Sequence, residues 1–165
     1  MKELELDFQD LECAMELQQD EMTHYLDKQT GEIITIMDDI SRYAEEEDID
    51  HLQDWEKRDV ELARKIESNW GNYIHVENVS SREGYRIMVG FAHTVKDENF
   101  QEKLFIALDG RGAFRRFKDV LYFNEDERQR FFKYHSESIK QIAEDWLESE
   151  DIKPVWISRY PKKSK

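Results

Sequence analysis

The segment over residues 85–95 constrains the fold more than any other, because its apolar residues recur at helical spacing on two sides. These apolar positions are Tyr85, Ile87, Met88, Val89, Phe91, Ala92 and Val95. Ser80 and Glu83 have the spacing of a capping box that would begin the helix. A helix that is apolar on two sides must be covered by other elements. We therefore predict a central buried helix, with Gly84 and Gly90 permitting close approach of its neighbours.

Other helices are predicted where apolar stripes follow N-capping residues. The expected ranges are about 7–21, 38–44, 54–69, 97–108, 113–121 and 124–150. Asp7, Asp97 and Asn124 are the expected caps of three of them, and Asp38 or Asp39 caps a fourth. The inner side of the 54–69 helix is predicted from Leu52, Trp55, Leu62, Ala63 and Ile66. The content of only six Gly and two Pro also favours helices over a turn-rich all-β fold.

A β-hairpin is predicted between the first two helices. Its β-prone runs are Thr23–Asp27 and Glu32–Met37. Gly31 stands in the short loop between them, where a positive φ is needed. Tyr25 pairs across the hairpin with Ile33, with Ile34 or along a diagonal, and the sequence leaves this register open.

Two further strands extend this sheet in our interpretation. They are Tyr73–Val76 and Val155–Ile157, and Pro154 makes the second an edge strand that joins the hairpin. The predicted fold is therefore α+β and mainly helical, with about five or six helices around the central helix and a small antiparallel sheet. At 165 residues we expect one globular domain over 1–158, followed by a basic C-terminal tail over 159–165.

The charge balance limits the classes of partner. The net charge is −14 and the pI is near 4.8, which disfavours extensive non-specific binding to nucleic acid or an anionic membrane. The lone Cys13 cannot form an internal disulfide, and the first residues lack the apolar run of a signal peptide. No apolar stretch approaches the length of a membrane span. We expect an acidic cytoplasmic protein with no membrane association.

The densest local pattern is the stretch Asp109–Asp119, which carries a basic cluster. Gly110 and Gly112 flank an arginine at the start of a helix, where free N–H groups and the helix dipole favour an anion. The cationic side chains of the cluster are Arg111, Arg115, Arg116 and Lys118. Phe114 and Phe117 are expected to face the core. This pattern predicts a binding site for an anionic ligand or an acidic partner protein.

The structural alternative, which the surplus of acidic residues favours, is that these arginines pair with neighbouring carboxylates. Arg115 and Asp119 already have the i,i+4 spacing of an ion pair. The glycines match neither a P-loop nor the dinucleotide-binding fingerprint, so the pattern predicts no nucleotide site.

Compact catalytic and metal-binding motifs are absent from the sequence. The five histidines are scattered, and with one cysteine no zinc pattern exists. His135 is interpreted as a half-buried core residue. The acidic run Glu45–Asp50 is interpreted as a solvated helix end and loop, because consecutive side chains do not converge on one ion. We predict no metal and no cofactor, and the catalytic residues of any enzymatic activity stay unknown.

Four stretches of the sequence resemble a bacterial family known as uncharacterised protein family 0158. They are Gly110–Asp119, Tyr25-Leu26-Asp27 with Thr30-Gly31-Glu32, Gly84-Tyr85-Arg86-Ile87-Met88, and Trp146-Leu147. The resemblance runs from about residue 5 to about residue 152. Relatives often carry a tryptophan early in the last long helix, where this chain has Phe131. The resemblance implies a domain over the whole chain and a bacterial cytoplasmic setting, and it implies no activity.

Two classes of function follow from these observations. The first is a non-enzymatic binding or regulatory module that uses the Arg111–Lys118 cluster as its contact site. The second is an enzyme that acts on a phosphorylated or nucleic-acid substrate with groups drawn from separated residues. The absence of a compact catalytic motif favours the first. The ligand, the oligomeric state and the pathway are not encoded in any recognisable motif.

Overall fold

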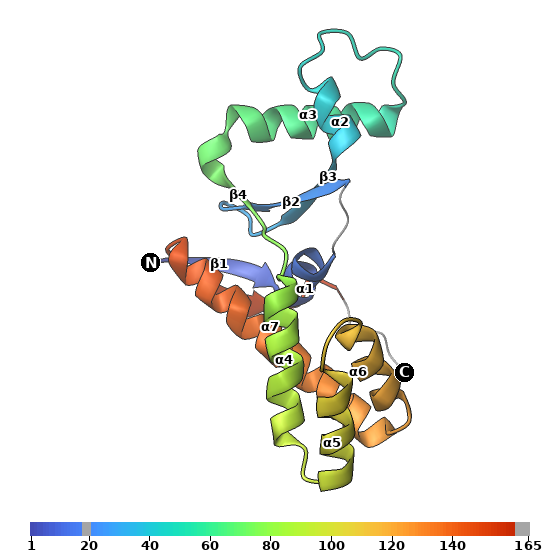
Figure 1. The fold of residues 1–165 in the computed structure, drawn as a ribbon. Helices are drawn as coiled ribbons and strands as arrows, with labels where there is room; N and C mark the ends of the chain where they lie inside the picture. Colours follow the sequence, from blue (N-terminus) through green and yellow to red (C-terminus); the bar gives the residue numbers. More distant parts are fainter. Residues whose placement is uncertain (18–20, 161–165) are drawn as a thin grey trace. The chain divides into compact units, whose positions relative to one another are not determined.

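The structure is a computed structural model that describes residues 1–17 and 21–160, and these fall into two compact units (Figure 1). Unit 1 consists of residues 1–78 together with the chain from residue 144 onward, and unit 2 consists of residues 79–143. The predicted class is confirmed: the fold is α+β and mainly helical. That residues 1–158 fold as one domain stays a prediction.

Unit 1 contains the two sheets. Its elements are β1 (Lys2–Asp7), α1 (Phe8–Glu16), β2 (Met22–Asp27), β3 (Ile33–Met37), α2 (Asp38–Tyr43), α3 (Asp54–Ser68), η1 (Trp70–Asn72), β4 (Tyr73–His75) and β5 (Ile152–Ile157). The antiparallel sheet has the order β3-β2-β4, which confirms the hairpin and its extension by β4. Tyr25 pairs with Ile34, so the register left open by the sequence is settled. Ile36 and Tyr73 pack with Ala63 and Ile66 of α3 in one buried cluster.

The prediction for the last strand is wrong in its partner. β5 pairs in parallel with β1 and not with the hairpin, so that Leu4 lies opposite Pro154. The sequence interpretation contained no strand at residues 2–7. In this short segment only Leu4 and Leu6 are buried apolar residues between acidic ones, and the partner strand lies about 150 residues away along the chain. No local pattern therefore indicated the pair.

Hydrogen bonds to the Asp27 carboxylate stabilise the hairpin loop. The Asp27 carboxylate accepts from the backbone N–H of Gln29 at 2.8 Å and from the Asn72 amide at 3.0 Å. Burial opposes ionisation of Asp27, but these hydrogen bonds, with that from Thr30, hold its pKa below the ordinary value. Gly31 has φ 74°, as predicted, and its Cα faces the Glu5 carbonyl oxygen so closely that a Cβ would overlap it.

Hydrogen bonds from Arg159 join the same loop to β1. Its guanidinium donates to the carbonyl oxygens of Glu5 and Thr30, at 3.3 and 2.8 Å, and its backbone N–H donates to Asp7 Oδ2 at 2.9 Å. The opposite oxygen of Asp7 caps α1 by accepting from Gln9, which confirms the predicted cap. The first residue of the expected basic tail thus takes part in the hydrogen bonding of unit 1, and residues 161–165 lie outside the described residues.

Three details of the predicted helices in unit 1 need correction. Helix α1 ends at Glu16, and residues 18–20 of the predicted helix lie outside the described residues. The N-cap of α2 is Met37, without a side-chain hydrogen bond, so the prediction of Asp38 or Asp39 as the cap is wrong. Trp55 is 50% exposed in the first turn of α3, where its indole N–H donates to Gln53, and it does not face inward.

His24 on β2 leads to a prediction about pH. The residue is buried, its Nδ1 lies 2.8 Å from Thr35 Oγ1, and its Nε2 has no partner among the described residues. Burial, with a smaller effect of His75, lowers the pKa of His24 below its ordinary 6.5. The unfolded chain therefore binds a proton more readily, and we expect stability to fall as the pH drops below about 6.5. Urea denaturation at pH 7.5 and 5.5 measures this loss.

The control for this prediction is the exposed His93. His24→Asn should make the loss of stability between the two pH values smaller, whereas His93→Asn should leave it as in the wild type. An unchanged pH dependence in His24→Asn would contradict the prediction.

Unit 2 is a bundle built on the predicted central helix. Its helices are α4 (Ser81–Thr94), α5 (Glu98–Ala107), α6 (Ala113–Tyr122) and α7 (Glu125–Ser149) up to residue 143. Ile87, Met88, Phe91 and Ala92 of α4 are buried. The Phe91 ring makes edge contacts with Phe117, Phe131 and Tyr134, at centroid distances of 6.3, 5.1 and 5.6 Å. The predicted caps Ser80, Asp97 and Asn124 are all confirmed.

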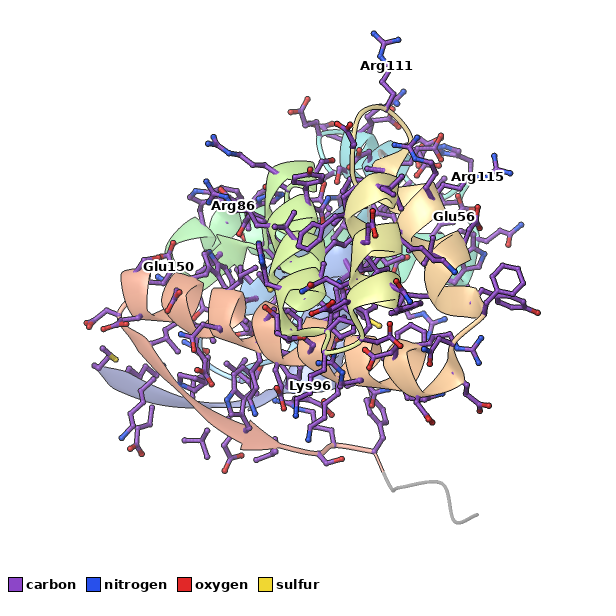
Figure 2. The ribbon with its side chains drawn as sticks, turned by 60° about the horizontal axis from the view of Figure 1, so that its bottom comes forward. Glu56, Arg86, Lys96, Arg111, Arg115 and Glu150 are labelled. Atoms are coloured by element: carbon purple, nitrogen blue, oxygen red, sulfur yellow. The ribbon has the colours of Figure 1, made fainter. Side chains whose placement is uncertain are left out.

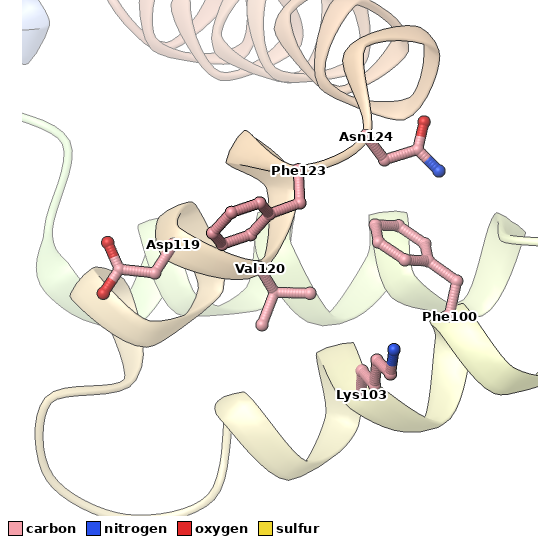
Figure 3. Close-up of a pocket in the computed structure, with 6 residues that line it drawn as sticks. All are labelled: Phe100, Lys103, Asp119, Val120, Phe123 and Asn124. Atoms are coloured by element: carbon pink, nitrogen blue, oxygen red, sulfur yellow. The ribbon is translucent and has the colours of Figure 1, made fainter.

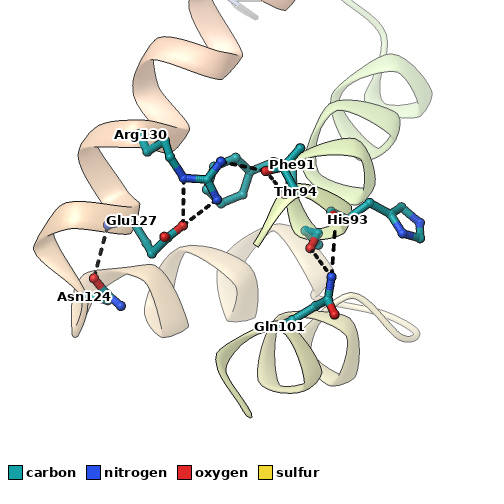
Figure 4. Close-up of polar contacts among 8 residues, drawn as sticks. Phe91, His93, Thr94, Gln101, Asn124, Glu127 and Arg130 are labelled. Carbon is teal, nitrogen blue, oxygen red and sulfur yellow. Dashed lines mark hydrogen bonds and ion pairs between the residues drawn. The ribbon is translucent and has the colours of Figure 1, made fainter. Parts of the chain in front are cut away.

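Polar contacts tie the helices of unit 2 together at one end of α4 (Figure 4). The Arg130 guanidinium lies 4.4 Å from the centre of the Phe91 ring and donates to Glu127 and to the Thr94 hydroxyl. The Gln101 amide donates to the Ala92 carbonyl oxygen at 2.9 Å, which joins α5 to α4. These contacts join α5 and α7 to α4.

Candidate functional site

Arg116 holds the turn between α5 and α6 through hydrogen bonds to its backbone. Gly110 and Gly112 both have positive φ, 79° and 77°, a conformation that glycine adopts without a Cβ penalty. The Arg116 Nε donates to the Ala107 carbonyl oxygen at 3.1 Å, and its two terminal nitrogens donate to the carbonyl oxygens of Arg111 and Asp109. This half-buried guanidinium therefore satisfies carbonyl oxygens at the end of α5 and in the turn after it.

The start of α4 supports the turn from the other side. The Tyr85 hydroxyl donates to the Leu108 carbonyl oxygen at 3.0 Å. The Phe114 ring packs on Gly84, so close that a Cβ there would lie 3.1 Å from the ring. Two of the stretches that carry the family resemblance, residues 84–88 and 110–119, thus meet at one place in unit 2. Gly84 and Phe114 form this contact.

Arg111, Arg115 and Lys118 differ from Arg116 because they are exposed. Within residues 1–17 and 21–160, no ion pair involves any of the three, and the i,i+4 pair of Arg115 with Asp119 is not formed. Arg111 points away from the turn and Arg115 points away from α6, in a different direction (Figure 2). Arg111 and Arg115 therefore do not converge on one small anion.

The two phenylalanines of α6 have different environments. Phe117 is 0% exposed and belongs to the core, as predicted. Phe114 is 42% exposed, so the prediction that it faces the core is wrong. Gly84 covers part of its ring, and the rest of the ring lies at the surface. The surface of α6 thus offers aromatic as well as cationic contacts.

The charge of the chain is unevenly divided between the units. Unit 2 carries 12 Lys and Arg against 10 Asp and Glu, a formal charge of +2. The rest of the chain carries 12 against 28, a formal charge of −16. The acidic composition of the whole therefore conceals a unit that is slightly basic.

The structure also contains a groove that the sequence interpretation missed. It has a volume of about 390 Å³ and lies between α5 and α6 near the start of α7 (Figure 3). Its lining residues are Phe100, Lys103, Asp119, Val120, Phe123 and Asn124. Phe123 is 87% exposed. The sequence does indicate exposed aromatic residues here. Tyr122 and Phe123 follow Leu121, the last buried position of α6, and do not continue its apolar stripe.

The role of Arg116 leads to a stability prediction. Arg116→Ala removes the donors to three carbonyl oxygens at the end of α5 and in the turn, and we expect a loss of about 1–3 kcal/mol. Arg115→Ala is the matched control and should change stability by less than about 0.5 kcal/mol, because that side chain is exposed and forms no ion pair with the residues that the structure describes. Chemical denaturation of both variants measures the difference. Equal midpoints would show that the turn does not depend on Arg116.

No helix within the described part of the chain combines the length and the apolar character that crossing a bilayer requires.

Comparison with known proteins identifies a family for this chain. A family model described as uncharacterised protein family (UPF0158) matches residues 1–164. The UPF0158 protein PA5073 of Pseudomonas aeruginosa is 26% identical over 144 residues, which cover 87% of this chain and 83% of that protein. No solved structure matches.

Proposed function

We propose that this chain, which belongs to the uncharacterised protein family UPF0158, is a non-enzymatic binding or regulatory module that contacts an anionic partner through α6 of unit 2. The observation that carries the proposal is the exposure of Arg111, Arg115 and Lys118 without ion pairs among the described residues. In a chain with 38 acidic and 24 basic residues, cations left unpaired are available to a partner.

The rigidity of the turn supports the same proposal. Arg116 and Tyr85 donate hydrogen bonds to carbonyl oxygens of the turn and of the end of α5. These bonds hold the backbone that carries Arg111 in place. A surface that is ordered before binding loses less conformational entropy when a partner arrives. The different directions of Arg111 and Arg115 suit an extended partner with several negative groups better than a single phosphate.

The proposal includes a cytoplasmic location, which the chemistry of Cys13 supports. This cysteine is free and exposed, and it is the only one in the chain. An exposed thiol of this kind is compatible with a reducing compartment.

The proposal is tested by reversing two charges. Arg111→Glu with Arg115→Glu should leave the far-UV circular dichroism and the denaturation midpoint unchanged, because both side chains are exposed. The variant and the wild type are screened against nucleic acids, nucleotides, phosphorylated metabolites and acidic peptides. We expect affinity for the bound class to fall by about tenfold or more, and wild-type binding to weaken as salt rises.

The control is Lys96→Glu with Lys133→Glu, which makes the same change in net charge at exposed positions of unit 2 outside the cluster. This variant should bind like the wild type. Equal loss of binding in both variants would show that the loss comes from the change in net charge and not from the cluster. Turnover of a phosphorylated substrate, abolished by changing a single carboxylate or histidine, would select the enzymatic alternative instead.

A further inference from the structure

We infer that the partner is a protein segment in which a large apolar side chain stands close to carboxylates. This inference rests on the proposed function, and it adds the groove between α5 and α6 to the contact surface. The apolar side chain would enter the groove, and the carboxylates would meet the cations of α6.

The groove is suited to an apolar anchor. Phe100 of α5, Val120 of α6 and Phe123 supply its apolar lining, and Figure 3 shows these three side chains around one hollow. A hollow of about 390 Å³ exceeds the volume of any single side chain. Phe123 is 87% exposed, and an exposed aromatic ring beside an apolar hollow is typical of interaction sites on protein surfaces.

The groove and the basic cluster are parts of one surface. Arg115 and Asp119 lie four residues apart on α6, so they are neighbours on the same exposed face, and Asp119 lines the groove. Lys118 is exposed on the same helix, and Lys103 lines the groove from α5. A segment that placed an apolar residue beside Val120 would therefore have cations within reach.

The same features argue against nucleic acid as the partner. Asp119 places a carboxylate in the groove, where it would repel a phosphate. Duplex DNA carries one negative charge about every 1.7 Å, and the chain outside unit 2 has a formal charge of −16. A peptide with two or three carboxylates suffers less of this repulsion, and its apolar side chain gains from burial against Phe100 and Phe123.

The experiment selects peptides from a random phage-displayed library on the full-length protein, and the enriched peptides are synthesised and measured by fluorescence anisotropy. We expect them to combine Phe, Leu or Trp with Asp or Glu. Phe123→Ser should weaken their binding by about tenfold or more, because it removes the groove's most exposed apolar wall. Phe132→Ser is the matched control, since this phenylalanine is also exposed, at 56%, and lies outside the groove lining.

The charge variants separate the two proposals. Loss of peptide binding in both Phe123→Ser and Arg111→Glu with Arg115→Glu supports the inference. If a single-stranded or duplex oligonucleotide binds through the arginines and Phe123→Ser has no effect, the proposed function stands and the inference is wrong. If selected peptides bind without needing the arginines, both are wrong.

Two further outcomes also overturn the inference. A library that yields no acidic and apolar peptide sensitive to Phe123→Ser shows that the groove does not receive such a segment. Sedimentation that shows a dimer of the wild type, lost in Phe123→Ser, would mean that a second copy of the chain covers the groove. Circular dichroism and thermal unfolding of each variant establish that it is folded before binding is measured.

Discussion

Gly31→Ala should destabilise unit 1 by about 2–5 kcal/mol. Gly31 has φ 74°, and a residue with a Cβ in this left-handed conformation costs about 1–2 kcal/mol. The added methyl group would also overlap the Glu5 carbonyl oxygen, which belongs to β1 and accepts a hydrogen bond from Arg159. Relieving such an overlap moves backbone, and overpacking of this kind costs about 1–3 kcal/mol more.

Gly110→Ala is the control that separates the two contributions. Gly110 has φ 79°, close to that of Gly31, but a Cβ there would meet no atom within 4 Å. We expect Gly110→Ala to cost only the conformational part, about 1–2 kcal/mol. Guanidinium denaturation of both variants gives the comparison. Similar losses in the two would show that the hairpin loop does not approach β1 as closely as described.

Phe117→Ala should cost about 3–5 kcal/mol, which is the usual loss for truncating a fully buried phenylalanine. Phe117 is 0% exposed, and its ring lies 6.3 Å from the centre of Phe91 and 5.1 Å from that of Phe131. Phe114→Ala, on the same helix, should cost less than about 1.5 kcal/mol because the ring is 42% exposed. A smaller loss for Phe117 than for Phe114 would mean that α6 is rotated about its axis.

Phe117→Ala also tests whether residues 1–158 form one domain. All four tryptophans lie in unit 1, at positions 55, 70, 146 and 156, so their fluorescence reports on that unit. Circular dichroism at the helical band reports on α4 to α7 as well. If the chain unfolds as one cooperative domain, the two signals shift together for Phe117→Ala, which lies in unit 2. Separate shifts would show that the units unfold independently.

The helices of unit 2 were predictable because their signals are local. The caps Ser80, Asp97 and Asn124 bond to backbone groups three residues away, and a bond of that range is visible in the sequence. The predicted hairpin has the same basis, since Gly31 and the β-prone runs around it are neighbours in the chain. The burial of Ile87, Met88, Phe91 and Ala92 on α4 followed from its apolar pattern. Tyr85, which belongs to the same pattern, is 39% exposed and was wrongly expected to be buried.

The candidate site was only partly predictable from sequence. The glycine turn and the cations of Asp109–Asp119 were visible, but charge alone does not distinguish the roles of Arg115 and Arg116. That difference depends on where helix α5 ends, because Arg116 donates its hydrogen bonds to the carbonyl oxygens of Ala107, Asp109 and Arg111. The groove needs side chains from α5 and α6 together, so it has no signature in either helix.

By itself the sequence determined the mainly helical α+β class, the starts of most helices and the positive φ of Gly31, because each depends on neighbours within a few residues. Only the tertiary structure decided that β5 pairs with β1, and that Phe117 is buried while Phe114 reaches the surface. The first joins residues about 150 positions apart, and the second depends on how much of α6 the neighbouring α4 covers at Gly84. Contacts of this kind depend on packing in space, and they leave no periodic trace along the chain.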